Sequence, residues 1–197
     1  MVMKDQNPVA LLGGHRTLPI VEAYYEFNHL KQLYRQGWLQ RGMPPKRCES
    51  VAEHTFGMAV LCMFLVDSYY PDLDRLKVLR MALLHDFGEI HAGDITLSDQ
   101  VDAHTKYALE RESVQQVLSR LPEGTTYLSL WQEYEDNASA EARFVKQIDR
   151  LEMALQAGIY QQQTLVNASD FMAAARRVVD LPELQVLLNE AATLVKS

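Results

Sequence analysis

The chain has 197 residues, of which 48% are hydrophobic and 23% are charged. This is the composition of an ordinary globular protein, and it argues against intrinsic disorder. Nineteen Lys and Arg residues stand against 26 Asp and Glu residues. The resulting net charge of −7 argues against broad electrostatic capture of nucleic acid or of an acidic membrane.

The chain shows no sign of export. It has two cysteines, Cys48 and Cys62, which are too few for an extracellular disulfide framework. Its first residues lack the apolar segment of a signal peptide, and no stretch approaches the roughly 18 uninterrupted apolar residues of a membrane span. We therefore expect a cytoplasmic protein that binds neither membrane nor nucleic acid.

Apolar periodicity predicts helices over nearly the whole chain. The first helix is expected at residues 17–34, and a turn-prone segment with Gly and Pro follows at 37–48. Ser50 and Glu53 have the spacing of a capping box, which begins a second helix with His54 on its buried face.

A third helix is expected to begin at Asp72 or Asp74 and to run toward His85 and Asp86. Its apolar positions are Leu76, Leu79, Leu83 and Leu84. A polar loop follows at 91–100, and further helices are predicted at 102–121, 125–137, 139–163, 169–179 and 183–196. Alternating β patterns and internal repeats are not found in the sequence, so we expect an irregular all-α bundle.

Four polar residues lie in apolar helical surroundings: His54, His85, Asp86 and Asp149. A buried imidazole or carboxylate without a partner costs several kcal/mol. His54 taken alone is better explained as a hydrogen-bonded core residue, and the pair His85-Asp86 is a weak signal by itself. Consecutive helical residues point about 100° apart, so His85 and Asp86 can reach one ion only at a distorted turn, which Gly88 favours. Together the four predict a divalent cation held by imidazole and carboxylate groups.

The order His, His-Asp, Asp resembles that of the HD-domain superfamily of metal-dependent phosphohydrolases. The segments ESVAEH at 49–54, ALLHDFGE at 82–89, GDI at 93–95 and LWQEYEDNASAEARFVKQID at 130–149 are similar to its 5′-deoxynucleotidase branch. The resemblance covers roughly residues 17–165. It implies one HD-domain helical bundle over residues 1–197, with helices at 169–197 packed on the motif core.

The resemblance also implies the site. His54, His85, Asp86 and Asp149 would hold one divalent ion, for which Mn, Co, Fe or Ni suits the donor set better than Mg. Two further acidic residues, Glu89 and Asp94, would be catalytic or would hold a second metal together with the Ile95 carbonyl. Softer assignments place two residues near the nucleotide, Trp38 as an apolar face and Arg41 as a phosphate-binding fork, although Trp38 is equally explained as a loop-covering hydrophobe.

The function implied is hydrolysis of deoxyribonucleoside 5′-monophosphates to deoxynucleoside and phosphate, by water that the metal activates. The alternatives are a catalytically silent HD module that binds a nucleotide or serves as a scaffold, and an HD phosphohydrolase acting on another nucleotide. The family tendency implies a homodimer. The amphipathic C-terminal helices would offer a self-complementary face for it, or would pack internally.

Overall fold

A computed structural model describes residues 2–196 and contains ten α-helices in that range. They are α1 (Pro19–Phe27), α2 (Gln36–Leu39), α3 (Val51–Tyr69), α4 (Arg75–Leu84), α5 (Glu89–Ala92), α6 (Ala103–Leu118), α7 (Gly124–Glu135), α8 (Ala140–Gln162), α9 (Ser169–Val178) and α10 (Pro182–Lys196). Five short 3₁₀ helices lie between them: η1 (Pro8–Leu12), η2 (Asn28–Lys31), η3 (Pro45–Arg47), η4 (His85–Gly88) and η5 (Leu97–Asp99). Two isolated β-bridges are the only strand pairing in the described residues, which confirms the all-α fold class.

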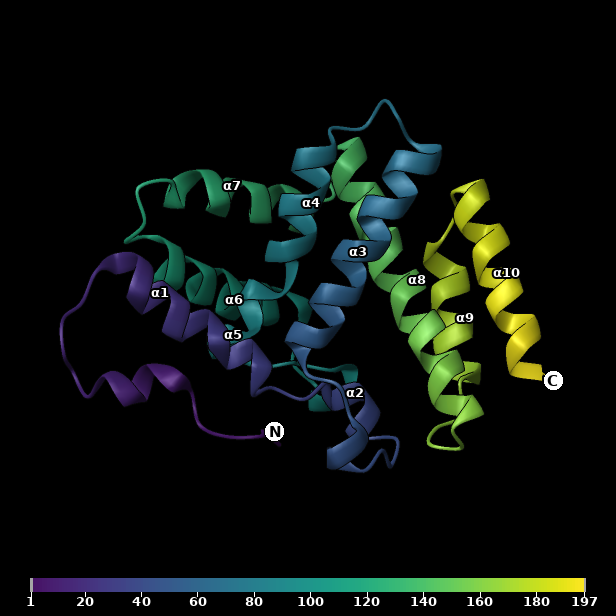
Figure 1. Cartoon of the computed structure of the whole chain (residues 1–197), viewed down its shortest axis with the longest axis horizontal. Helices are drawn as coiled ribbons and strands as arrows, with labels where there is room; N and C mark the ends of the chain where they lie inside the picture. The colour runs from purple at the N-terminus through teal and green to yellow at the C-terminus, as the bar shows by residue number, and fades with distance from the viewer. Residues whose placement is uncertain (1, 197) are drawn as a thin grey trace.

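Helix α3 runs through the middle of the molecule and separates two groups of helices (Figure 1). On one side α8 packs against α3 and α4, and α9 and α10 pack on α8. On the other side α6 contacts α1, α5 and α7. Each group encloses its own hydrophobic core, and α3 contributes to both, with Met58 in one core and Val51 in the other.

The C-terminal helices turn their apolar residues inward. Phe171, Met172 and Ala175 of α9 and Leu184 and Leu188 of α10 are buried in the same core as α8. The arrangement is that of helices packed on a motif core, although the assignment of residues 1–197 to one domain stays a prediction. The self-complementary face expected on these helices is therefore largely used within the chain.

The first helix ends earlier than the sequence predicts. It was expected to reach residue 34, but α1 stops at Phe27. There the side-chain amide of Asn28 donates a hydrogen bond to the Tyr24 carbonyl at 2.6 Å. After the single turn η2, the backbone becomes extended, and the Arg35 N–H donates to the Glu49 carbonyl at 3.1 Å. Backbone hydrogen bonds to the start of α3 thus replace helical ones, and they direct the Arg35 side chain toward the centre of the molecule.

The predicted helix starts around the site are confirmed. Ser50 and Glu53 form the capping box of α3, and the Asp74 side chain caps α4 by accepting from the Lys77 N–H. The predicted distortion at His85 is also confirmed, because α4 gives way to the 3₁₀ turn η4 there. A side chain at Gly88 would clash with α6, since an added Cβ would lie 2.5 Å from the Glu110 Cβ.

The face that α4 buries differs from the apolar positions read in the sequence. Its buried residues are Val78, Met81 and Ala82, whereas Leu76 and Leu83 are exposed. Helix α3 is long and apolar enough to cross a membrane, judged by length and composition only. Within its 18-residue apolar stretch, 44% is buried inside the protein. Because α3 carries buried polar residues and packs between α4 and α8, we interpret it as a core helix.

Candidate metal centre

The four residues of the sequence motif meet at one point between the two helix groups. The His54 Nε2 atom from α3 lies 3.3 Å from Asp149 Oδ1 on α8 and 3.8 Å from Asp86 Oδ2 on η4. The His85 Nε2 atom lies 3.0 Å from the same Asp86 oxygen. The 3₁₀ turn allows the consecutive His85 and Asp86 side chains to point toward the same place.

The polar atoms that meet there lack hydrogen-bond partners. His54 Nε2, His85 Nε2 and Asp86 Oδ2 are all buried and make no hydrogen bond within the described part of the chain. Buried polar atoms are nearly always satisfied, so this concentration of exceptions in one place needs an explanation. A bound cation would satisfy all of them together.

The other nitrogen of each imidazole is engaged. His85 Nδ1 is 2.8 Å from the Ala82 carbonyl oxygen, and His54 Nδ1 is 2.6 Å from Glu152 Oε2. A backbone carbonyl oxygen and a carboxylate accept hydrogen bonds but do not donate them. Each Nδ1 atom therefore carries the proton. In the neutral ring this leaves the Nε2 lone pair directed into the cluster.

His54 and the carboxylates beside it shift one another's pKa. Burial and Arg35 disfavour a charged His54, but contacts with Asp149 and Glu152 outweigh them and raise its pKa to about 10. The pKa of Asp149 lies below its ordinary range, because contact with His54 outweighs the opposite effect of burial. The carboxylates around His54 thus favour positive charge at this point, and a metal ion there would bind the deprotonated Nε2 atom.

The donor set fits a divalent transition metal. Ligand atoms about 2.1 Å from an ion and at right angles to one another are about 3 Å apart, close to the spacing of these atoms. One ligand atom each from His54, His85 and Asp149 lie within 4.8 Å of one another. Two imidazoles with two carboxylates form a mixed N and O site of the kind that Mn, Co, Fe and Ni accept.

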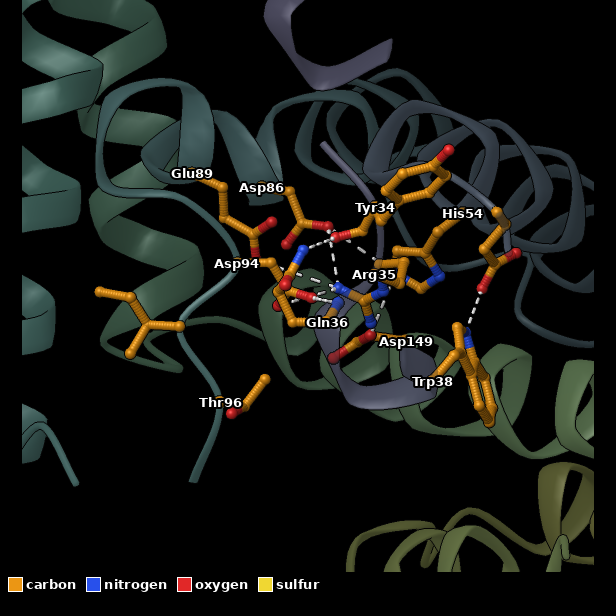
Figure 2. Close-up of polar contacts among 12 residues, drawn as sticks. Tyr34, Arg35, Gln36, Trp38, His54, Asp86, Glu89, Asp94, Thr96 and Asp149 are labelled. Atoms are coloured by element: carbon orange, nitrogen blue, oxygen red, sulfur yellow. Dashed lines mark hydrogen bonds and ion pairs between the residues drawn. The ribbon is translucent and has the colours of Figure 1, made fainter. Parts of the chain in front are cut away.

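A second group of charges lies next to the cluster, with Arg35 at its centre. The Arg35 Nη1 atom is 3.7 Å from Asp86 Oδ2, 3.9 Å from Glu89 Oε1 and 3.9 Å from Asp94 Oδ1. Figure 2 shows the Arg35 side chain in the middle of the site, with Asp86, Glu89 and Asp94 to one side and His54 to the other. Asp94 also accepts the backbone N–H of Gln36, which fixes the segment that carries Arg35.

The Ile95 carbonyl, which was expected at a second metal site, accepts a hydrogen bond from a lysine of the chain. The Lys106 Nζ atom donates to the Ile95 carbonyl at 3.2 Å and lies 3.4 Å from Glu110 Oε1. Glu89, Asp94 and Ile95 thus all face positive side chains of the protein itself. Burial and repulsion from Asp86 and Asp94 nevertheless raise the pKa of Glu89 well above its ordinary value.

Trp38 and Arg41, the two residues expected near the nucleotide, lie outside this cluster of contacts. Trp38 is 2% exposed, its ring packs against Phe171 at a centroid distance of 4.1 Å, and its indole N–H donates to Glu49 at 2.7 Å. The Arg41 guanidinium lies over the ring of the same Phe171, 4.4 Å from its centroid. These contacts favour packing for Trp38, and a role of either residue in substrate binding stays a prediction.

Three residues of the site, Arg35, Lys106 and Glu152, were not identified from the sequence. Arg35 follows the expected end of a helix that stops earlier, so no periodicity marked it. Lys106 lies one turn before Glu110 on the helix predicted at 102–121, where no sequence pattern distinguishes it from other charged residues. Glu152 had a usable signal, since it is a charged residue one turn after Asp149 on the buried face of α8.

Comparisons with known proteins identify the family. The model of the HD domain family matches residues 27–185. The bovine protein named 5′-deoxynucleotidase HDDC2 is 33% identical over 192 residues, which is 95% of this chain and 91% of that one. The human protein of the same name is 34% identical and covers 92% of this chain and 88% of its own.

A solved structure has the same fold. The PH0347 protein of Pyrococcus horikoshii superposes with a TM-score of 0.73 at 30% identity, over 89% of this chain and 98% of that one. The family match over residues 27–185 includes the helices that carry all four motif residues. The chain belongs to the HD domain family.

Proposed function

We propose that the protein is a metal-dependent 5′-deoxynucleotidase, which hydrolyses deoxyribonucleoside 5′-monophosphates to a deoxynucleoside and phosphate. The observation that carries this proposal is the convergence of buried, unpartnered donor atoms of His54, His85 and Asp86 beside Asp149. The activity named for the similar bovine and human proteins supports the choice of substrate.

The ion would be held by His54, His85, Asp86 and Asp149, and we propose one transition metal ion per chain. When bound, a divalent ion there supplies positive charge for the phosphoryl oxygens and makes water a stronger nucleophile near neutral pH. A single ion is favoured because the Arg35 guanidinium lies 3.9 Å from the carboxyl groups of Glu89 and Asp94, and Lys106 already donates to the Ile95 carbonyl.

Arg35 would bind the phosphate group. Its distances of 3.7 to 3.9 Å to three carboxylates are longer than hydrogen bonds, so charge holds the guanidinium in place while its N–H groups remain able to turn toward a ligand. A guanidinium matches two phosphate oxygens at once. Asp94 would act indirectly, by holding the Arg35–Gln36 backbone through its bond to the Gln36 N–H.

Glu89 would manage the proton. Its side chain is buried on the first turn of α5, and burial together with repulsion from Asp86 and Asp94 raises the pKa of its carboxyl well above the ordinary value, which favours the protonated form. A neutral carboxyl can donate a hydrogen bond and then its proton to the departing 5′-oxygen, which would otherwise leave as an unstable alkoxide. This assigns acid catalysis to Glu89 and positioning to Asp94.

The nucleoside would lie in a pocket next to Asp94. The pocket has a volume of about 510 Å³, and Gln36, Leu39, Gln40 and Ile95 are among its lining residues. Leucine and isoleucine side chains offer apolar contact for a sugar or base. The amides of Gln36 and Gln40 are hydrogen-bonded within the chain and shape the wall of the pocket. The pocket therefore joins the proposed phosphate site to a surface of nucleoside character.

Phosphate release is the direct test. Protein stripped with a chelator would be reloaded with Mn²⁺, Co²⁺, Ni²⁺ or Mg²⁺ and assayed with dAMP, dCMP, TMP and the corresponding ribonucleotides. We expect metal-dependent release from the deoxynucleotides. Metal binding to the four residues without turnover of any nucleotide would instead indicate the silent binding or scaffold module.

We further propose a cytoplasmic homodimer that binds neither nucleic acid nor membrane. The net charge of −7 and the two free cysteines support the compartment and the absence of a nucleic-acid partner. Exposed apolar side chains on α3, among them Phe56 and Phe64, support self-association. Light scattering of the wild type and of Phe64→Glu would test the dimer.

A further inference from the structure

The two histidines of the cluster are held in different ways. The Nδ1–H of His85 is bound by the Ala82 carbonyl of its own helix. The Nδ1–H of His54 is bound by a side chain from another helix, the Glu152 carboxylate of α8, at 2.6 Å. The orientation of His54 thus depends on a residue that can be replaced, whereas that of His85 depends on the backbone.

Helix geometry places Glu152 for this contact. Asp149 and Glu152 are three residues apart on α8, so their side chains lie on the same face of that helix. Asp149 Oδ1 lies 3.3 Å from His54 Nε2, and Glu152 Oε2 lies 2.6 Å from His54 Nδ1. Two successive carboxylates of one helix therefore face the two nitrogens of one imidazole.

Helix α3 leaves room for the Glu152 carboxylate at Gly57, one turn after His54. A Cβ added at Gly57 would lie 3.0 Å from Glu152 Oε1, which is closer than an ordinary contact. A glycine in the middle of a helix lowers its stability, so its presence here is consistent with space kept for that oxygen. Gly57 and Glu152 also line a second pocket, of about 510 Å³, on the side of His54 away from the cluster.

We propose that Glu152 is a positioning residue for the metal centre. Its carboxylate accepts the His54 Nδ1–H, fixes the ring orientation and directs the Nε2 lone pair to the ion. Such partners of metal-binding histidines typically change metal affinity by about 10- to 100-fold. The proposal rests on the metal dependence proposed above, and it adds a residue that touches neither metal nor substrate.

Metal affinity of two variants tests the role. Glu152→Met has similar length without an acceptor and is expected to bind Mn²⁺ about 10- to 100-fold more weakly, measured by competition with a chelator. Glu152→Gln keeps an acceptor oxygen and is expected to restore most of the affinity. Gln156→Ala, one turn further along α8 in the same pocket, serves as the matched control and is expected to match the wild type.

Proton NMR of the Zn²⁺-loaded protein gives a second reading that does not depend on turnover. The wild type should show two slowly exchanging downfield imidazole N–H signals, one from each Nδ1. Glu152→Met should lose the His54 signal and keep that of His85, which is bonded to the Ala82 carbonyl.

Wild-type affinity together with both N–H signals in folded Glu152→Met would overturn the proposal. So would equal losses of affinity in Glu152→Met and Glu152→Gln. If the methionine variant does not fold, Glu152→Ala replaces it with the same expectations. A wild type that binds metal at the four residues but hydrolyses no nucleotide would contradict the proposed function while leaving the role of Glu152 open to both measurements.

Discussion

The two charged regions at the centre of the molecule differ in what they contain. In the cluster of His54, His85, Asp86 and Asp149, buried nitrogen and oxygen atoms have no hydrogen-bond partner. In the neighbouring region, Glu89 Oε2 is likewise buried without a hydrogen-bond partner, but the carboxyl groups of Glu89 and Asp94 lie 3.9 Å from the Arg35 guanidinium. The first region directs two imidazole nitrogens and two carboxylates toward one point, whereas the second surrounds an arginine side chain with carboxyl groups. Of two neighbouring groups of acidic residues, the one that also contains imidazole nitrogens is therefore the better candidate for a metal site.

The largest effect is expected from removing a ligand of the first region. Asp149→Ala should lose the bound ion and at least about 1000-fold of phosphate release, since several kcal/mol of charge stabilisation correspond to about three powers of ten. Metal analysis and a phosphate assay measure the two losses. Asp136→Ala, at an exposed position just after α7, is the control. Full activity in metal-free Asp149→Ala would contradict the metal site.

Removing the positive charge of Arg35 should make the second region able to bind a metal ion, as the first is. Arg35→Met leaves buried carboxylates without their partner, and we expect the free energy of unfolding to fall by about 3 kcal/mol or more. Added Mn²⁺ should recover much of this loss, with bound ions rising from one to two per chain. Urea unfolding and metal analysis measure both. Two ions per chain in the wild type would show that Arg35 does not exclude a second metal.

The pH dependence of stability tests Glu110, the buried carboxyl group that pairs with Lys106. Burial raises the pKa of Glu110 to about 7 from an ordinary value of 4.5, and Lys106 only partly opposes it. The folded state then binds this proton more tightly than the unfolded chain does. The protonated Glu110 therefore makes its full contribution to the free energy of unfolding below about pH 4.5, and this contribution is lost as the pH rises toward 7. The difference amounts to about 3 kcal/mol. Glu110→Gln should flatten the profile of urea unfolding between pH 5 and 7.5, and an unchanged slope would refute the assignment.

Glu89 offers a smaller test that separates catalysis from metal binding. Glu89→Gln has the shape of the protonated carboxyl but no proton to give, so kcat should fall by about 100-fold while bound metal and melting temperature stay near wild type. Kinetics and metal analysis of the same sample measure this. A loss of metal in Glu89→Gln would make Glu89 a ligand instead of an acid.

The smallest effect is expected at Gly57. Gly57→Ala should stabilise α3 by up to about 1 kcal/mol, because alanine is the better helix former. The added Cβ should at the same time displace the Glu152 carboxylate slightly and weaken Mn²⁺ binding severalfold. Thermal unfolding and chelator competition should therefore move in opposite directions. A gain in stability with unchanged affinity would show that the carboxylate adjusts without cost.

Local patterns in the sequence predicted most of the helices and the residues of the cluster. Helix periodicity placed His54 on a buried face, and Gly88 indicated the distorted turn at His85. Arg35 could not be found in this way, because long-range backbone bonds end α1 early and direct its side chain inward. The burial of Trp38 likewise depends on Phe171, which lies more than a hundred residues further along the chain.

The most direct test of the account is the location and number of the bound ions. Crystals grown with Mn²⁺ or Co²⁺, with diffraction recorded on both sides of the metal absorption edge, should show one anomalous peak per chain. That peak is expected between His54 Nε2, His85 Nε2, Asp86 and Asp149. A peak among Glu89, Asp94 and Ile95 instead, or no peak at the four residues in crystals of active protein, would contradict it.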